Sequence, residues 1–191
     1  MECDLVEIYE VLLNKIIQQE QYQNNYKVLV KEICQGVANI VGTTDKLASI
    51  IVKDSNLCNL ILQVDKQYTD ASIKSEIVCL FFNALDTGSD KIKFELLRQP
   101  IIEYFIDSLL VKELNNQIMA LSGLQYLLDY GKDINIEFDL KLNIVAKQIE
   151  DLNGVIILEK LRDSQNKDIS ALASEMLQSF FQKEESNSLN N

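Results

Sequence analysis

The side chains that could carry out chemistry in this sequence are carboxylates and cysteines, because the chain contains no histidine. Histidine is the commonest general base and metal ligand near neutral pH, so Ser-His or Cys-His nucleophiles and His-ligated zinc are excluded. Carboxylates such as Glu32 and Glu76 fall at equivalent places of a repeat and do not converge on one pocket. The sequence therefore predicts a protein that is not an enzyme and that has no cofactor and no metal.

The cysteines also favour a structural role. Cys3, Cys34, Cys58 and Cys79 are scattered without a C-x-x-C pair, and three of them fall inside apolar helical patterns. Cysteine in such a pattern behaves as a small hydrophobe, so we expect reduced and buried thiols.

The acidic N-terminal residues give no basic signal-peptide region, and no apolar run approaches the ~18 residues of a membrane span. We therefore expect no membrane association and a place in the cytoplasm and nucleus.

Composition narrows the class of partner and of fold. The 29 acidic residues outnumber the 18 basic ones, and the formal net charge of -11 is the wrong sign for neutralising phosphates. Nucleic acid is therefore not an expected partner, and basic polypeptides are. One proline, six glycines and no tryptophan leave few turn formers for a fold of many short strands.

Apolar residues recur at three- and four-residue spacing along most of the chain, which is typical of amphipathic helices. The first helix is expected over 5–17 with Asp4 as its N-cap, followed by a polar loop over 18–25. Gly42, Gly88 and Gly131 each follow the longest helix of a group and are interpreted as helix ends. The other expected helices cover the stripe from Val30 to Val41 that Gly42 ends, residues 45–53, 56–66, 71–86, 90–98, a segment beginning at Pro100, 115–130, 138–152, 155–163 and a last segment that reaches Phe181.

The three glycines lie 46 and 43 residues apart, each after a short-short-long group of helices. A period of about 40–47 residues with three helices is typical of armadillo repeats. We therefore predict an all-α, right-handed armadillo solenoid over 1–185, with a partial leading repeat (1–43), three repeats (44–88, 89–131 and 132–185) and a disordered tail (186–191). An irregular helical bundle with evenly spaced glycines is the alternative that spacing leaves open.

The last group is more specific. Without gaps, residues 149–185 resemble the C-terminal end of importin alpha, in which an Ile-Glu pair, a glycine turn, a short helix, a polar turn and a helix closing on Phe precede an acidic tail. The residues at those places are Ile149, Glu150, Gly154, Leu161, Asn166, Ile169, Ala173 and Phe181. The resemblance corresponds to about the last four repeats of the family's longer solenoid.

The earlier third helices are similar to the family's Lys-Glu-x-x-Trp-x-x-x-Asn motif. KEICQGVAN (31–39) has Gln35 at the Trp position and Asn39 at the Asn position, and SEIVCLFFN (75–83) has Cys79 and Asn83 there. Ser122 and Tyr126 occupy the corresponding places in the next third helix. The resemblance implies an adaptor of nuclear import that holds extended basic polypeptide, with these six residues lining the binding wall. Local hydrogen bonding near a helix end is an equally open role for the two asparagines.

The resemblance also implies transport partners. Asp163, Asp168, Glu184 and Glu185 would correspond to the surface that the family offers to its recycling exportin, although terminal acids are often simply solvated. The basic N-terminal segment with which the family binds importin beta has no counterpart in the sequence. The alternative function is a structural subunit of a larger assembly, in which residues 5–17, similar to the second helix of a repeat without its first, stack on another chain.

Overall fold

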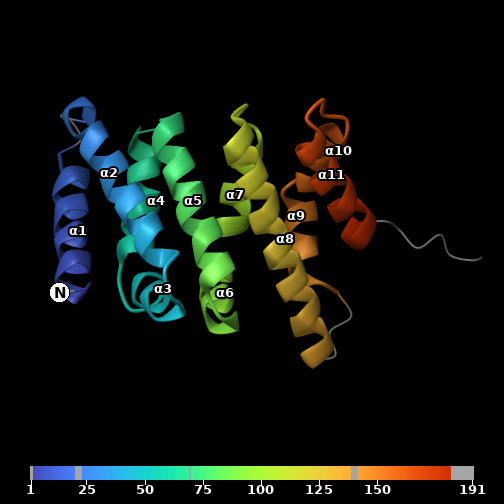
Figure 1. The fold of residues 1–191 in the computed structure, drawn as a ribbon, viewed down its shortest axis with the longest axis horizontal. Helices are drawn as coiled ribbons and strands as arrows, with labels where there is room; N and C mark the ends of the chain where they lie inside the picture. Colours follow the sequence, from blue (N-terminus) through green and yellow to red (C-terminus); the bar gives the residue numbers. More distant parts are fainter. Residues whose placement is uncertain (1, 20–22, 69, 139–141, 182–191) are drawn as a thin grey trace, which may run out of the picture.

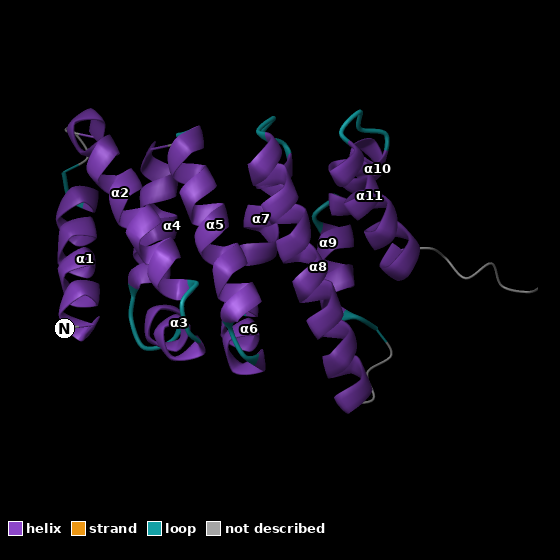
Figure 2. Ribbon diagram, viewed as in Figure 1, coloured by secondary structure: helices purple, strands orange, loops and turns teal. Residues whose placement is uncertain are grey.

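The structure, a computed structural model, describes residues 2–19, 23–68, 70–138 and 142–181, and all the regular secondary structure in this part of the chain is helical. Turns and short loops join the helices (Figure 2), and no strand occurs among the described residues. The helices are α1 (Glu2–Ile17), α2 (Gln23–Val41), α3 (Asp45–Val52), α4 (Leu57–Tyr68), α5 (Ala71–Thr87), α6 (Asp90–Leu97), α7 (Ile101–Leu109), α8 (Leu114–Glu137), α9 (Ile144–Asp151), α10 (Gly154–Arg162) and α11 (Lys167–Met176), followed by the π-helical turn η2 (Leu177–Phe181).

The helices stack along one axis into a solenoid (Figure 1). The last helices of successive units, α2, α5, α8 and α11, pack on one another in that order, and α1 packs on α4. The short helices α3 and α6, each of eight residues, pack on each other at one edge of the array. Neighbouring units are thus in contact through equivalent helices, which confirms the predicted all-α solenoid.

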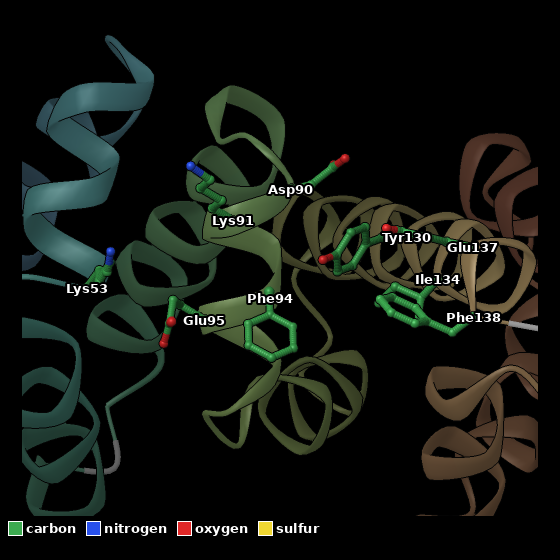
Figure 3. A pocket seen from close by; sticks show the side chains of 9 residues that line it. All are labelled: Lys53, Asp90, Lys91, Phe94, Glu95, Tyr130, Ile134, Glu137 and Phe138. Carbon is green, nitrogen blue, oxygen red and sulfur yellow. The ribbon is translucent and has the colours of Figure 1, made fainter. Parts of the chain in front are cut away.

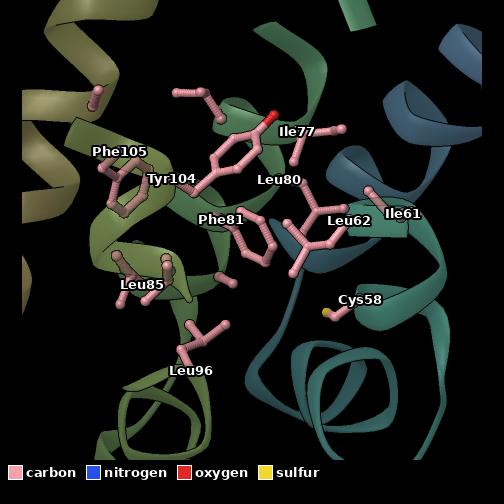
Figure 4. Close-up of a cluster of buried hydrophobic side chains, with 14 of the residues drawn as sticks. Cys58, Ile61, Leu62, Ile77, Leu80, Phe81, Leu85, Leu96, Tyr104 and Phe105 are labelled. Carbon is pink, nitrogen blue, oxygen red and sulfur yellow. The ribbon is translucent and has the colours of Figure 1, made fainter. Parts of the chain in front are cut away.

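One apolar core runs through the whole stack, from Val6 on α1 to Met176 on α11. Phe81 and Phe105 are its largest fully buried side chains, and Figure 4 shows them with their aliphatic neighbours between α4, α5 and α7. The edge of the Phe81 ring meets the Tyr104 ring, with centroids 5.8 Å apart and an interplanar angle of 69°. Since a repeat cannot bury its apolar faces alone, this continuous core is what stabilises the stack.

Two of the three glycines end helices as predicted, and the third does not. Gly42 and Gly88 directly follow α2 and α5, whereas Gly131 lies inside α8, which continues to Glu137. A Cβ on Gly131 would overlap the Asn143 Oδ1 atom and would lie 2.9 Å from Val145 Cγ2. Gly131 therefore makes room for the start of α9, and the predicted end of the third helix at residue 131 is wrong.

Several other predicted boundaries are corrected. Asp4 lies inside α1, which begins at Glu2, so it is not the N-cap. The loop predicted over 18–25 is shorter, because α2 begins at Gln23 and its Tyr26 side chain packs against the core and donates to Gln19 Oε1 at 2.7 Å. The helix predicted over 138–152 begins at Ile144, because Asn143 caps it. Residues 186–191, the predicted tail, lie outside the described residues.

The last helix changes its winding before it ends. After Met176 the α-helix continues as η2, in which Phe180 and Phe181 are half-buried against the core.

Among the described helices, none is by itself long and apolar enough to cross a membrane, and α3 and α4 reach that length only as a pair bent by 62°.

Candidate functional site

The six residues proposed from the sequence lie on three adjacent helices. Gln35 and Asn39 are exposed on α2, Cys79 and Asn83 are half-buried on α5, and Ser122 and Tyr126 are half-buried on α8. Because α2 packs on α5 and α5 on α8, these residues form three successive rungs. We call this surface the third-helix wall; α2, α5 and α8 lie side by side in Figure 1.

The side chain of Asn83 is already engaged between two rungs. Its Nδ2 donates to the Ala38 carbonyl oxygen on α2 at 3.0 Å and also reaches Cys79 Sγ at 3.6 Å. Gly42 leaves room for this amide, since a Cβ there would lie 3.2 Å from Asn83 Nδ2. The bond fixes the amide, so that its Oδ1 is the atom left to accept from a bound backbone.

Asn39, the equivalent residue on α2, is in a different state. Its side chain is exposed and forms no hydrogen bond with the described residues, so both its donor and its acceptor are free. An amide of this kind can accept a backbone N–H and donate to a backbone C=O at once. Asn39 is therefore the most available clamping residue on the wall.

Tyr126 closes the next interface. Its hydroxyl donates to Asp86 Oδ1 at 2.6 Å, and its ring lies 6.0 Å from the Phe82 ring at an angle of 37°. The hydrogen bond to Asp86, with its negative charge, raises the pKa of Tyr126 above its ordinary value. Tyr126 thus ties α8 to α5, and the hydroxyl is not free to donate to a ligand.

The charges along the wall are mostly acidic. Lys31 lies 3.9 Å from Glu76 across the α2–α5 interface, which leaves that pair neutral. Glu32 is exposed without an ion pair among the described residues, and the exposed carboxylate of Asp86 receives only the Tyr126 hydroxyl. The wall therefore offers two carboxylates without an ion pair among the described residues, one on the helix of Asn39 and one on the helix of Asn83, and they attract cationic groups.

The cysteines are not nucleophiles in this environment. Cys34 and Cys58 are buried free thiols, and burial raises the pKa of each to about 12. Cys79 is half-buried, a correction to the expectation that the helical cysteines are all buried, and desolvation raises its pKa as well. A thiol reacts as its thiolate, which these shifts suppress near neutral pH. Among the described residues no group of three Cys, Asp or Glu side chains is arranged to hold a metal ion.

A pocket that the sequence interpretation missed lies between α6 and the C-terminal turns of α8. It has a volume of about 370 Å³, and Phe94, Tyr130, Ile134 and Phe138 line it together with charged residues (Figure 3). The signal was present in the sequence, because the apolar residues 130, 134 and 138 recur at four-residue spacing across Gly131. It was missed because Gly131 was interpreted as the helix end.

Comparison with known proteins supports the repeat interpretation. Residues 143–191 match the family model of an atypical Arm repeat, a segment that includes α9, α10 and α11. A search of curated proteins gives no match. The fold and the match define an armadillo-like helical solenoid, and Arm repeats generally mediate contacts between proteins. The chain is accordingly a helical repeat protein of the protein-binding class.

Proposed function

We propose that this protein is a non-enzymatic adaptor that holds an extended basic polypeptide along the third-helix wall, as the resemblance to importin alpha implies. The observation that carries the proposal is the register of the wall. Asn39 and Asn83 occupy equivalent turns of two helices in direct contact, and Tyr126 follows on the third. An extended chain crossing α2 and α5 would meet an amide on each of them.

The available atoms suit a backbone ligand. Asn39 supplies a donor and an acceptor, and Asn83 supplies Oδ1, each hydrogen bond contributing about 1 kcal/mol net. The carboxylates of Glu32 and Asp86 attract the lysines of a basic peptide. The polar pattern therefore supports sequence-tolerant, salt-sensitive binding.

The third-helix wall lacks aromatic rings at two of the positions that would bind the lysine side chains of a peptide. Gln35 and Cys79 stand at positions where the family carries tryptophan, and neither has a ring that could stack on a lysine stem. Each missing ring forfeits about 0.5–2 kcal/mol of cation-π interaction, so two weaken binding by about 5- to 1,000-fold. We therefore expect dissociation constants well above those of a wall with a full tryptophan array.

Titration calorimetry with a lysine-rich localisation peptide tests the proposal. At low salt we expect measurable binding that weakens about fivefold to thirtyfold in Asn39→Ala, which removes up to two hydrogen bonds, and that falls steeply with added salt. Asn59→Ala is the matched control, because Asn59 is an exposed asparagine on α4, away from the wall. Equal binding by wild type and Asn39→Ala, or no binding at low salt, would refute the clamp.

A role in nuclear transport is part of the same proposal. It places the protein in the cytoplasm and nucleus, with an exportin as a further partner. Asp163 and Asp168 are exposed at the turn between α10 and α11, where they are accessible to such a partner. Glu184 and Glu185 lie outside the described residues. Asp163→Lys should weaken capture by a purified recycling exportin, and unchanged capture would remove this part of the proposal.

One observation favours the alternative, a structural subunit of a larger assembly. The outer side of α1 and the start of α2 expose several large apolar residues: Leu5, Ile8, Val11, Val28 and Leu29. Leu12 and Leu13, which a stacking segment over 5–17 would be expected to expose, do not belong to this set, because Leu13 is fully buried and Leu12 is packed against the core. Exposed apolar residues on neighbouring turns are typical of a surface that another chain covers.

Sedimentation of the protein in native extract distinguishes the two functions. A structural subunit should sediment in a large complex, and Ile8→Glu should release it as a monomer. An adaptor should sediment the same way with or without that substitution. Lys112→Glu, an exposed change in the loop after α7 and away from α1, controls for altered charge.

A further inference from the structure

We propose that the pocket between α6 and the last turns of α8 is a second protein-binding site, which takes one large apolar side chain from a partner segment that carries acidic residues beside it. This site is separate from the third-helix wall and does not depend on the function proposed for that wall. The partner segment expected at this site is acidic, whereas the polypeptide proposed for the third-helix wall is basic.

The extension of α8 beyond Gly131 creates the pocket. Tyr130, Ile134 and Phe138 project from successive turns of α8, and Phe94 faces them from α6 (Figure 3). Phe94 is 53% exposed and Phe138 is 63% exposed, so both rings present apolar surface to water. Burying one side chain of Leu or Phe size strengthens binding by about ten- to 150-fold, and 370 Å³ is ample room for it.

Contacts between α6 and α8 hold the walls of the pocket in place. The Tyr130 ring is half-buried at the α6–α8 contact, and Lys93 Nζ lies 5.8 Å from its centroid. Lys93 in turn pairs with Asp90 at 3.1 Å. These contacts hold α6 against α8, so an entering side chain does not have to separate the helices, and little of its binding free energy is lost to reorganisation.

The charges at the rim identify the kind of partner. The rim acids on α6 are already neutralised, Asp90 by Lys93 and Glu95 by Arg98 at 3.1 Å. Lys53 and Lys91 are exposed and form no ion pair among the described residues.

Lys91 lies near Asp45 and helps to lower the pKa of that carboxyl group. The main cause of the low pKa of Asp45 is a hydrogen bond, in which Asp45 Oδ1 accepts the backbone N–H of Ser89 at 2.6 Å. Lys53 and Lys91 form no ion pair among the described residues, and two such cations beside an apolar pocket stand out in a chain of net charge -11. Glu137 lies at the other end of the pocket, on α8 (Figure 3), and it would repel an acidic residue placed there. The acidic flank of the partner should therefore lie toward α3 and α6.

Fluorescence polarisation of labelled ten-residue peptides tests this site directly. One peptide has a central phenylalanine flanked by glutamates, a second has lysine flanks, and a third has a central alanine with glutamate flanks. With the full chain we expect the first to bind at least tenfold more tightly than the other two. Equal binding of all three, or no binding of the first at 1 mM protein, would overturn the proposal.

Three variants locate the binding. Phe94→Glu, at an exposed position, should weaken binding of the glutamate-flanked peptide at least tenfold, and Lys91→Glu should shift the preference toward lysine flanks. Leu110→Glu is the matched control, since Leu110 is 64% exposed at the end of α7 and outside the pocket. An equal loss in Leu110→Glu would contradict the assignment. Titration of the lysine-rich peptide into Phe94→Glu should give the wild-type result, which separates failure of this site from failure of the wall.

Discussion

Replacing asparagine by aspartate should have opposite consequences at two helix caps that look alike in the sequence. Asn143 Oδ1 accepts the backbone N–H groups of the second and third residues of α9 at 3.0 and 3.2 Å. Asn166 does the same for α11 at 3.0 and 3.1 Å. Aspartate caps as well as asparagine does, and its charge is favourable at a helix N-terminus. The caps differ in the other half of the amide, because Asn143 Nδ2 also donates to the Leu128 carbonyl oxygen on α8 at 2.9 Å.

The magnitude follows from that single bond. Asn143→Asp removes a hydrogen bond of about 1 kcal/mol and leaves a half-buried carboxylate oxygen facing a carbonyl oxygen, which costs about 1 kcal/mol more. We expect a loss of about 2 kcal/mol, or about 4–8 °C in Tm for a chain of this length. Asn166→Asp should stay within about 0.5 kcal/mol of wild type, because Asp168 in the same turn opposes the small gain from the helix dipole.

Urea unfolding followed by circular dichroism at neutral pH measures both variants. Alanine at each position provides the reference, with an expected loss of about 1 kcal/mol at residue 166 and about 2 kcal/mol at residue 143. The first turn of α9 carries no acidic residue, so without the Leu128 bond Asn143→Asp would be neutral or stabilising. Equal stability of the two aspartate variants would refute the reasoning.

Three further predictions concern packing, pH and thiols. Gly123→Ala should lower the free energy of unfolding by about 1–2 kcal/mol, because its Cβ would lie 2.5 Å from the rigid, buried ring of Phe105. Gly36→Ala would approach only the Tyr9 side chain, with the hydroxyl at 2.7 Å, and it should be neutral or stabilising by up to about 1 kcal/mol in the same urea assay. The pKa of Asp70 is lowered by its ion pair with Lys27 on α2, at 2.5 Å, and by the hydrogen bonds that it accepts as the N-cap of α5. The contribution of Asp70 to the free energy of unfolding is therefore complete above pH ~4 and is lost as pH falls below that value. Acid titration of Asp70→Asn should lack this part of the unfolding transition. Cys34 and Cys58 should resist alkylation at pH 8 in the folded protein and react in urea, as mass spectrometry would show; modification without urea would contradict their burial.

The sequence predicts the helices well and their ends less well. Apolar spacing is a property of a single helix, and it located every group that forms the core. A helix end depends on what lies beside it. Gly42 and Gly131 are indistinguishable along the chain, yet one ends a helix and the other makes room for Asn143. That difference arises from contact between helices that the local pattern does not contain.

The same limit applies to the candidate site. The register of Asn39 and Asn83 could be predicted because it needs only the repeat length. The hydrogen bond from Asn83 to Ala38 could not, since it joins residues 45 positions apart and depends on how closely α2 and α5 pack. The bond makes the two asparagines different, one fixed and one free, although the sequence presents them as equivalent. The pocket beside Phe94 was missed for a related reason, because it requires the true length of α8.

The side-by-side packing of α2, α5, α8 and α11 also determines how the molecule comes apart. The main helix contacts lie within a unit or between neighbouring units, so loops of about 50 residues or fewer close them, and the entropy cost of closing one more loop stays small. Structure can therefore grow from any one unit by adding the next, and it can be lost in the same stepwise manner. Pulled by its two ends in an optical trap, the chain should lengthen in successive steps of one or two units, and the terminal helices should give way before the central pair α5 and α8.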